Sequence, residues 1–157
     1  MYIISACLCG VNCKYNGKNN YNEYCFDLLI KGKALIVCPE QLGGLTTPRV
    51  PSEIQGCAEK VLKGITKIVT KDGIDVTENF IRGGDEVVKL AKRLDIKKAI
   101  LKDGSPSCGV NYVYDGTFSD KKIKGMGLTT LKLKQLSIDV ISEKDLGGKE
   151  NGHFWFL

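Results

Sequence analysis

The sequence predicts an α/β domain whose core is a mostly parallel sheet flanked by helices. Short apolar segments typical of buried strands occur at residues 3–5, 34–38, 99–101 and 138–142. Segments with helical spacing of apolar residues lie between them, at 23–31, 78–94 and 129–136. Strands that alternate with helices favour parallel pairing through right-handed crossovers.

A chain of 157 residues is within the usual size of one domain. We therefore expect a single, Rossmann-like three-layer domain over residues 1–157. Residues 147–157 end in Phe-Trp-Phe-Leu, and we expect this aromatic tail to dock on the body or on a neighbouring subunit.

Several connecting segments are predicted from turn-forming residues. Residues 10–20 are rich in Gly and Asn, and residues 40–56 have no helical period, so both are expected to be loops. A weaker strand is expected at 65–70, and Thr77 is expected to cap the helix at 78–94. The expected core face of that helix consists of Phe80, Val87, Leu90, Ala91 and Leu94.

The composition excludes a disordered chain and a membrane protein, because 43% of residues are hydrophobic and 26% are charged. The net charge of +5 comes from basic residues spread along the chain, so ordinary surface charge is favoured over a nucleic-acid footprint. The first ten residues contain neither a basic leader nor an apolar run of signal-peptide length. We therefore expect a cytoplasmic protein, a monomer or homodimer, without a membrane partner.

Three of the seven cysteines lie at the carboxyl end of a predicted strand or in the segment that follows it: Cys7, Cys38 and Cys108. An odd number of cysteines in a reducing compartment favours metal ligands or reactive thiols over a disulfide framework. Loops from the carboxyl ends of parallel strands meet at one edge of the sheet. A shared metal site is therefore favoured, while three separately buried thiols remain the alternative.

A site built from thiolates, in a chain whose single histidine is His153, favours zinc or an iron-sulfur cluster. Three ligands leave a fourth position open, and no CxxC pair is present to close a zinc site. Cys9 in an extended segment would point away from Cys7, whereas Cys13 lies on a loop that could fold back. Cys25 and Cys57 are expected to be small buried side chains.

Five stretches of the chain carry a family resemblance: residues 5–10 (SACLCG), 38–51 (CPEQLGGLTTPRVP), 75–80 (DVTENF), 105–109 (SPSCG) and 114–118 (YDGTF). In this order they resemble the thiouracil desulfidase family, formerly the domain-of-unknown-function family 523, over residues 3 to about 143. The resemblance implies a 4Fe-4S cluster held by Cys7, Cys38 and Cys108, with the fourth iron open. It also implies an enzyme that removes sulfur from a thiolated nucleobase such as 2-thiouracil, leaving the oxo base and sulfide without redox change.

The same motif match puts Glu40 and Ser105 at positions of proton transfer. Glu40 is expected to activate water as a general base, or else only to hold its loop. Ser105 is expected to pass a proton, or to stabilise the turn before Pro106. Arg49 is a candidate for binding an anionic oxygen of the substrate, with a loop salt bridge as the alternative, and Ser107 is a second candidate for substrate binding.

Two residues depart from the family pattern, Cys9 where an aliphatic residue is common and Thr46 where proline is frequent. Neither is an expected ligand. The expected partner is a small thiolated nucleobase, and nucleic acid is a less favoured alternative. A non-enzymatic iron-sulfur or zinc-binding sensor or structural module remains the alternative function.

Overall fold

A four-stranded parallel sheet organises the protein, in a computed structural model that describes residues 1–147. Its strands are β1 (Tyr2–Ser5), β2 (Ala34–Val37), β5 (Lys98–Leu101) and β8 (Asp139–Ser142), arranged in the order β2-β1-β5-β8. All three strand pairs are parallel. The predicted mostly parallel α/β sheet is confirmed.

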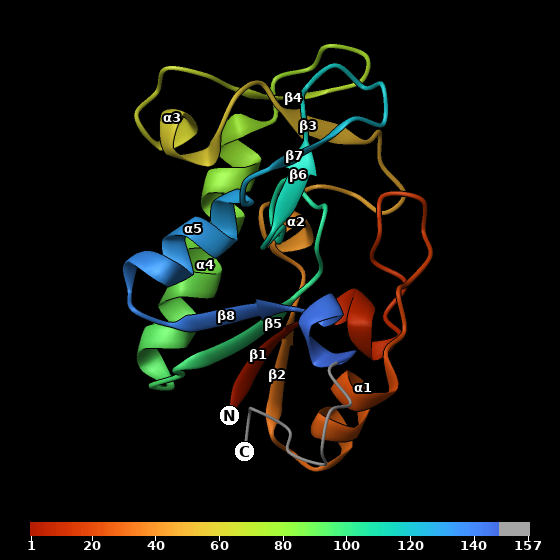
Figure 1. The fold of residues 1–157 in the computed structure, drawn as a ribbon, viewed down its shortest axis with the longest axis vertical. Helices are drawn as coiled ribbons and strands as arrows, with labels where there is room; N and C mark the ends of the chain where they lie inside the picture. The colour runs from red at the N-terminus through yellow and green to blue at the C-terminus, as the bar shows by residue number, and fades with distance from the viewer. Residues whose placement is uncertain (148–157) are drawn as a thin grey trace.

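Helices cover both faces of this sheet, which makes three layers (Figure 1). Helices α4 (Thr77–Arg93) and α5 (Leu128–Gln135) lie on one side, and α1 (Glu23–Ile30) lies on the other. Neighbouring residues of a strand point to opposite faces, so Ile3 packs in the cluster with α4 and α5, whereas Ile4 packs in the cluster with α1. Both side chains are fully buried, which explains the continuous apolar strands.

Two small antiparallel sheets lie beyond the carboxyl ends of the main strands (Figure 1). Strand β3 (Ser52–Ile54) pairs with β4 (Ile68–Thr70), and β6 (Tyr112–Tyr114) pairs with β7 (Lys122–Lys124). The short helix α3 (Ala58–Leu62) connects β3 to β4. A separate apolar cluster joins this region to α4 and α5 and includes Ile54, Val61, Ile68, Phe80 and Leu128.

The predicted loop at 40–56 is confirmed for residues 43–51 and 55–56 and is wrong where it includes residues of a helix and a strand. A short helix, α2 (Pro39–Leu42), begins directly after Cys38, and β3 follows it. Proline suits the first position of a helix, because its missing N–H would have no intrahelical partner there. Four residues are too few to show a helical period. The weak strand predicted at 65–70 exists as β4, but it pairs with β3 outside the main sheet.

The predicted cap of α4 is also wrong. Thr77 is the first residue of the helix, and the Asp75 carboxylate accepts hydrogen bonds from both its backbone N–H (3.0 Å) and its hydroxyl (2.6 Å). The predicted core face holds at Phe80 and Val87, which are fully buried, but Leu94 is 49% exposed. The helix ends at Arg93, so Leu94 no longer follows the helical face.

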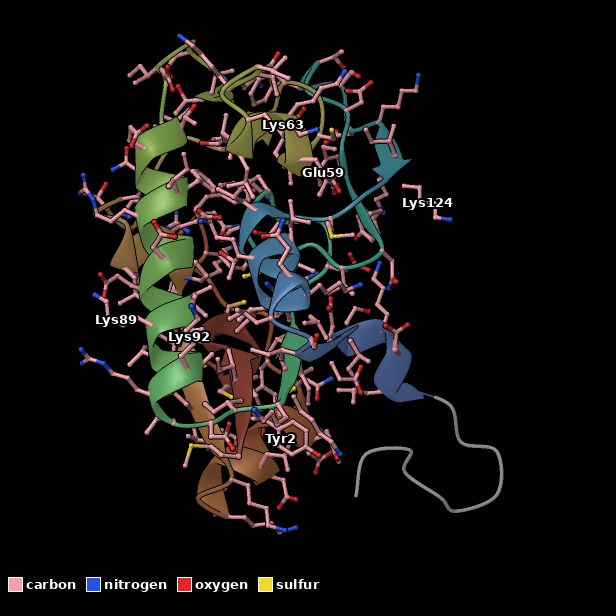
Figure 2. The ribbon with its side chains drawn as sticks, turned by 90° about the vertical axis from the view of Figure 1, so that its left-hand side faces the viewer. Tyr2, Glu59, Lys63, Lys89, Lys92 and Lys124 are labelled. Carbon is pink, nitrogen blue, oxygen red and sulfur yellow. The ribbon has the colours of Figure 1, made fainter. Side chains whose placement is uncertain are left out.

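The outer face of α4 carries lysines that point into solvent, including Lys89 and Lys92 (Figure 2). Within the described residues, no helix is both long and apolar enough to cross a bilayer. The expectation of a docking tail at 147–157 falls almost wholly outside the described residues.

Helix α2 and helix α4 pack backbone against backbone, through two glycines. A Cβ added to Gly83 would lie 1.8 Å from the Pro39 carbonyl oxygen, and one added to Gly43 would lie 1.9 Å from the Asn79 carbonyl oxygen. The Asn79 amide also donates to the Gly43 carbonyl (2.9 Å). This close packing fixes α2, and with it the residues on either side of Pro39.

Replacing Gly83 by Ala is expected to destabilise the protein by about 1–3 kcal/mol, because the two helices must separate to admit the methyl group. The control is Gly84→Ala, where the nearest atoms belong to the flexible Lys132 side chain, at 3.0 Å. Urea unfolding of both variants measures the difference. Equal stability of the two variants would show that the close contact is not needed.

Candidate active site and metal centre

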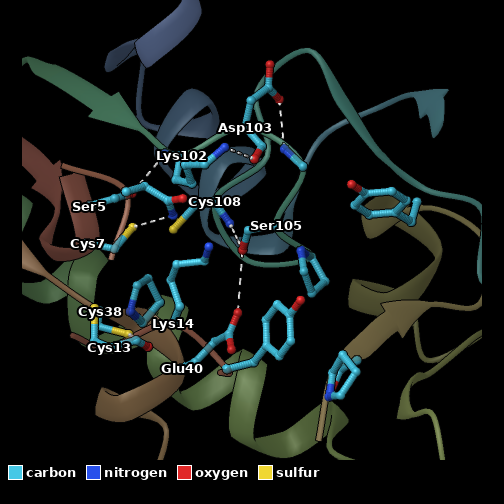
Figure 3. Close-up of a pocket in the computed structure, with 18 of the residues that line it drawn as sticks. Ser5, Cys7, Cys13, Lys14, Cys38, Glu40, Lys102, Asp103, Ser105 and Cys108 are labelled. Atoms are coloured by element: carbon cyan, nitrogen blue, oxygen red, sulfur yellow. Dashed lines mark hydrogen bonds between the residues drawn. The ribbon is translucent and has the colours of Figure 1, made fainter. Parts of the chain in front are cut away.

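A cavity of about 510 Å³ lies between the carboxyl ends of β1, β2 and β5 and the two small antiparallel sheets. Four cysteines line it: Cys7, Cys13, Cys38 and Cys108. Glu40, Arg49 and Ser105 line the same cavity, and Figure 3 shows Glu40 and Ser105 facing each other across it. The structure therefore brings together the three cysteines predicted to share a site.

Cys7 lies in a single turn of 3₁₀-helix, η1 (Ala6–Cys9), that continues β1. Gly10 ends this turn with a φ of +86°, a value that glycine adopts without a steric penalty. The loop that follows folds back, so that the Asn20 side-chain amide donates to the Cys7 sulfur at 3.6 Å. The pKa of Cys7 is lowered, chiefly by the neighbouring Cys13 thiol and against the effect of burial.

Cys38 precedes the first turn of α2. The pKa of its thiol is lowered to about 7, first by a hydrogen bond from Cys13 and then, against burial, by the backbone N–H of Gln41. A helix N-terminus stabilises a thiolate because its first N–H groups have no intrahelical acceptor. Cys38 is therefore suited to bind a metal as a thiolate.

Cys108 sits in the loop after β5, and the start of α5 holds this loop. The backbone N–H groups of Leu128 and Thr129 donate to the Pro106 and Ser107 carbonyls, each at 2.9 Å, and the Thr130 hydroxyl donates to the Cys108 carbonyl at 2.9 Å. Burial raises the pKa of the Cys108 thiol, although its hydrogen bond with Ser5 acts in the opposite direction.

Asp103 organises the loop between β5 and β6. One of its carboxylate oxygens accepts backbone N–H bonds from Gly104, Val110, Asn111 and Tyr112, at 3.0–3.2 Å. Burial alone would raise the pKa of Asp103, but the N–H donors together outweigh it and lower the pKa. The carboxylate thus holds the chain on both sides of Cys108.

Cys13 joins the site, and Cys9 does not. The Cys13 thiol lines the cavity beside Cys38 (Figure 3), whereas the Cys9 thiol donates to the Cys25 carbonyl at 3.5 Å. Cys9 was expected to point away because of an extended backbone. It does point away, but as part of a 3₁₀ turn.

The remaining two cysteines do not line the cavity. Cys25 is fully buried, as predicted, whereas Cys57 is only partly buried, directly before α3.

Glu40, Arg49 and Ser105 form one hydrogen-bonded group. Arg49 Nε donates to Glu40 Oε2 at 2.6 Å, and the Ser105 hydroxyl donates to Glu40 Oε1 at 3.4 Å. The other guanidinium nitrogens of Arg49 donate to the Thr46 carbonyl (3.1 Å), the Thr47 hydroxyl (3.0 Å) and the Cys13 carbonyl (2.9 Å). The salt bridge considered for Arg49 is thus present, and its role in substrate binding stays a prediction.

Ser105 also stabilises its turn, since its hydroxyl oxygen accepts the backbone N–H groups of Ser107 and Cys108 at 3.0 Å each. Ser107 lies elsewhere: it is 1% exposed, its hydroxyl pairs with Thr129 at 3.0 Å, and it does not line the cavity. The structure therefore does not bring Ser107 to the substrate side.

Several cavity residues were not predicted from the sequence. Asn20 hydrogen-bonds to the sulfur of Cys7, Ser5 lines the cavity, and Lys14 extends into the cavity in Figure 3. Ser5 could have been suspected from its position at the end of β1, but Asn20 and Lys14 depend on how the loop at 10–20 folds back.

The donor set consists of thiolates, which suit an iron-sulfur cluster. Within residues 1–147, no three His, Cys, Asp or Glu side chains are arranged to chelate one metal ion. Cys7, Cys38 and Cys108 nevertheless line one cavity from three adjacent strand ends. Cysteines of a cluster bind different irons, so they need not converge on one point.

The fold and the cavity together define an α/β protein with a cysteine-lined pocket at the carboxyl end of its sheet, the usual position of a binding site in this architecture. The family model described as 2-thiouracil desulfurase matches residues 2–145. The chain belongs to this family. This confirms the family predicted from the five motifs and, with it, the prediction of an enzyme.

Two relatives show the extent of the similarity. The solved structure of the 4Fe-4S-dependent thiouracil desulfidase TudS is 39% identical, with a TM-score of 0.83, covering 92% of this chain and 91% of the other. The uncharacterized protein YbbK of Bacillus subtilis (strain 168) is 47% identical over 147 residues, which is 93% of this chain and 97% of YbbK. The likeness to TudS confirms the predicted fold.

Replacing Asp103 by Asn is expected to destabilise the metal-free protein by about 2 kcal/mol at pH 7, because buried N–H groups lose a charged acceptor. The folded-state pKa of Asp103 is lowered. The Asp103 carboxylate therefore stabilises the folded protein fully at pH values above its unfolded-state pKa of about 3.9. This stabilisation is lost as the pH falls through the folded-state pKa. Urea unfolding between pH 7 and 3 should show a smaller acid loss in the variant. The exposed Asp139→Asn is the control.

Proposed function

We propose that the protein removes the sulfur of a thiolated uracil such as 2-thiouracil, using a 4Fe-4S cluster held by Cys7, Cys38 and Cys108. The observation that carries this proposal is the hydrogen-bonded pair of Glu40 and Ser105 in the cavity that these cysteines line. Family membership and the similarity to a 4Fe-4S-dependent thiouracil desulfidase support it.

The overall reaction replaces C=S by C=O. Water supplies the oxygen and two protons, and the sulfur leaves as hydrogen sulfide. No oxidant or reductant is consumed. The three cysteines hold the cluster, which when bound supplies a soft Lewis acid for the thiocarbonyl sulfur.

Glu40 is the general base of this proposal. Its Oε2 is fixed by Arg49 at 2.6 Å, and its Oε1 faces the Ser105 hydroxyl at 3.4 Å. With Arg49 holding one oxygen, the other oxygen is oriented to take a proton from water as it attacks the thiocarbonyl carbon. The side chains of Glu40 and Arg49 are only 15% and 9% exposed, which limits competing solvent.

Ser105 carries the proton between Glu40 and the substrate. Its oxygen already accepts two backbone N–H groups, so its own hydrogen is free to be directed at the Glu40 carboxylate. A proton gained by Glu40 can return through the same hydroxyl to the base ring or to the departing sulfur. Arg49 acts here as a positioning residue.

A closed four-cysteine module is the second candidate, because Cys13 lies beside Cys7 and Cys38. Such a module would have no open position for substrate sulfur and no need for the pair of Glu40 and Ser105. The experiments below distinguish the desulfidase from the closed four-cysteine module.

Anaerobic reconstitution with iron and sulfide tests the proposal. We expect close to four irons and four sulfides per chain. Loss of the thiocarbonyl absorption of 2-thiouracil should accompany the formation of uracil and sulfide in equal amounts. Cys7→Ala, Cys38→Ala and Cys108→Ala should each lose the cluster, whereas Cys57→Ala should keep it. A fully loaded wild-type protein that never forms uracil would exclude the proposed activity on this substrate.

Replacing Glu40 by Gln is expected to lower kcat on the order of 10²–10⁴-fold while leaving the iron content unchanged, because the amide cannot accept a proton. Glu59→Gln, an exposed substitution on α3 that Figure 2 labels, is the control and should keep the wild-type rate. Steady-state kinetics together with iron analysis distinguish a lost base from a lost cluster. A Glu40→Gln rate close to wild type would remove Glu40 from the mechanism.

A further inference from the structure

A groove on the outer side of α1 exposes apolar side chains to solvent. Ile30 is 70% exposed and Tyr21 is 56% exposed. The Tyr21 ring packs at an angle on the Phe26 ring, with centroids 5.5 Å apart. Phe26 and Ile30 are four residues apart and therefore share one face of the helix. This α1 groove, of about 560 Å³, is lined by Tyr21, Glu23, Tyr24, Phe26, Asp27 and Ile30.

The α1 groove is separate from the cavity that the cysteines line, because no residue lines both. The proposed function uses none of its side chains. Its two acidic residues, Glu23 and Asp27, are four residues apart and give the apolar surface a polar edge. An exposed apolar surface with a polar rim is typical of an interaction site.

The described part of the chain ends beside this groove. The last turn, η2 (Glu143–Gly147), follows β8, and its Leu146 packs in the same apolar cluster as Phe26. In Figure 1 this turn, drawn in blue, lies close to α1. Glu143 anchors the turn through Lys102 at 2.6 Å and the Asp103 backbone N–H at 2.8 Å. The segment that follows Gly147 therefore starts next to α1.

The sequence that follows is suited to cover an apolar surface. Residues 148–157 read GKENGHFWFL, so four consecutive apolar residues stand at 154–157. Aromatic side chains bury about 150–250 Å² each and are unfavourable when a cluster of them faces water. The family model matches residues 2–145, so this segment lies beyond the part of the chain that the model covers.

The connection is long enough for docking within one chain. Six residues, 148–153, separate Gly147 from Phe154, and at about 3.3 Å per extended residue they span roughly 20 Å. Helix α1 has 8 residues and is about 12 Å long. Glycines at 148 and 152 allow the chain to turn toward the helix. No second copy of the protein is needed to fill the groove.

We propose that residues 154–157 pack into the α1 groove of their own chain, against Tyr21, Phe26 and Ile30. The proposal does not depend on the proposed function. A buried indole N–H needs an acceptor, and the carboxylates of Glu23 and Asp27 supply acceptors for Trp155 at the edge of the groove.

Docking at this place also stabilises the segment that holds the Cys7 turn. Tyr21 stands between Asn20 and Asn22, whose backbone N–H groups donate to the Cys7 and Leu8 carbonyls at 2.9 and 2.8 Å. A side chain that covers Tyr21 thus restrains the backbone bonded to η1.

Trp155 is the only tryptophan of the sequence, so its fluorescence reports on the segment directly. In the full-length protein, at equal iron content, we expect blue-shifted emission and acrylamide quenching several-fold weaker than after unfolding in urea. Ile30→Glu puts a charge into the groove and should move both values toward those of the unfolded chain, with unchanged far-UV circular dichroism. Ile65→Glu is the matched control, since Ile65 is 67% exposed outside the groove, and it should keep the wild-type values.

Three results would overturn the proposal. The first is wild-type emission equal to that of the unfolded protein, and the second is the same response in both variants. The third is emission that shifts with protein concentration together with a dimer in sedimentation, because a second copy would then fill the groove.

Hydrogen exchange is a second test, and it leaves the groove itself unchanged. In full-length Trp155→Ser, the backbone N–H groups of α1 should exchange several-fold faster than in the wild type, because the helix loses its cover. Exchange in α4, on the other face of the sheet, should stay the same. Unchanged exchange in α1 would contradict the proposal.

Discussion

The whole site depends on the parallel pairing of β1 with both of its neighbours. In the register of the sheet Ser5 lies beside Val37, and Ile4 lies beside Ile100. Strands β2, β1 and β5 therefore end at the same edge, and the chain leaves each of them toward the same cavity. Cys7 and Cys38 follow within two residues of their strand ends, so small shifts of the backbone translate directly into shifts of the sulfurs. Cys108 is farther from its strand, and the start of α5 and the Asp103 carboxylate compensate for the greater length of its loop.

Arg49 connects parts of the chain that the sheet does not hold. Its guanidinium bonds to Glu40 after β2, to Cys13 in the loop after β1, and to Thr46 in its own loop. This side chain is 9% exposed, so its five N–H donors need partners inside the protein. The hydrogen bonds that satisfy these donors hold both the Glu40 carboxylate and the loop that contains Cys13 in place. The same ion pair that orients the proposed base thus also fastens the loop that carries Cys13.

The main sheet could be predicted from the sequence because its strands are buried on both faces and form continuous apolar runs. The three strand-end cysteines followed from that prediction. The segment after Cys38 could not be predicted, since α2 is one turn long and begins at a proline, a residue equally typical of a loop. The sequence did not predict that Asp75 accepts the N–H of Thr77, the first residue of α4. Asp and Thr are both common before a helix, and Thr77 is nearer to the first apolar residue of the helical pattern. At the site, Asn20 reaches the Cys7 sulfur, whereas the hydroxyl of Ser107 pairs with Thr129 instead. Which of these two side chains lies in the cavity depends on how its loop folds, and the residues beside it in the sequence do not predict that.

The residues proposed for metal binding and those proposed for proton transfer lie on the same short segments of the chain. Glu40 follows Cys38 on α2, and Ser105 precedes Cys108 in the loop after β5. The close contact of Gly83 with Pro39 fixes α2, and the two N–H groups bound to Ser105 fix its loop. The separation of Glu40 and Ser105 is therefore set by backbone packing and needs little additional ordering of flexible side chains. Displacing a segment that carries one of these cysteines would also move Glu40 or Ser105, so the geometry proposed for sulfur capture and the geometry proposed for proton transfer cannot change independently in this fold.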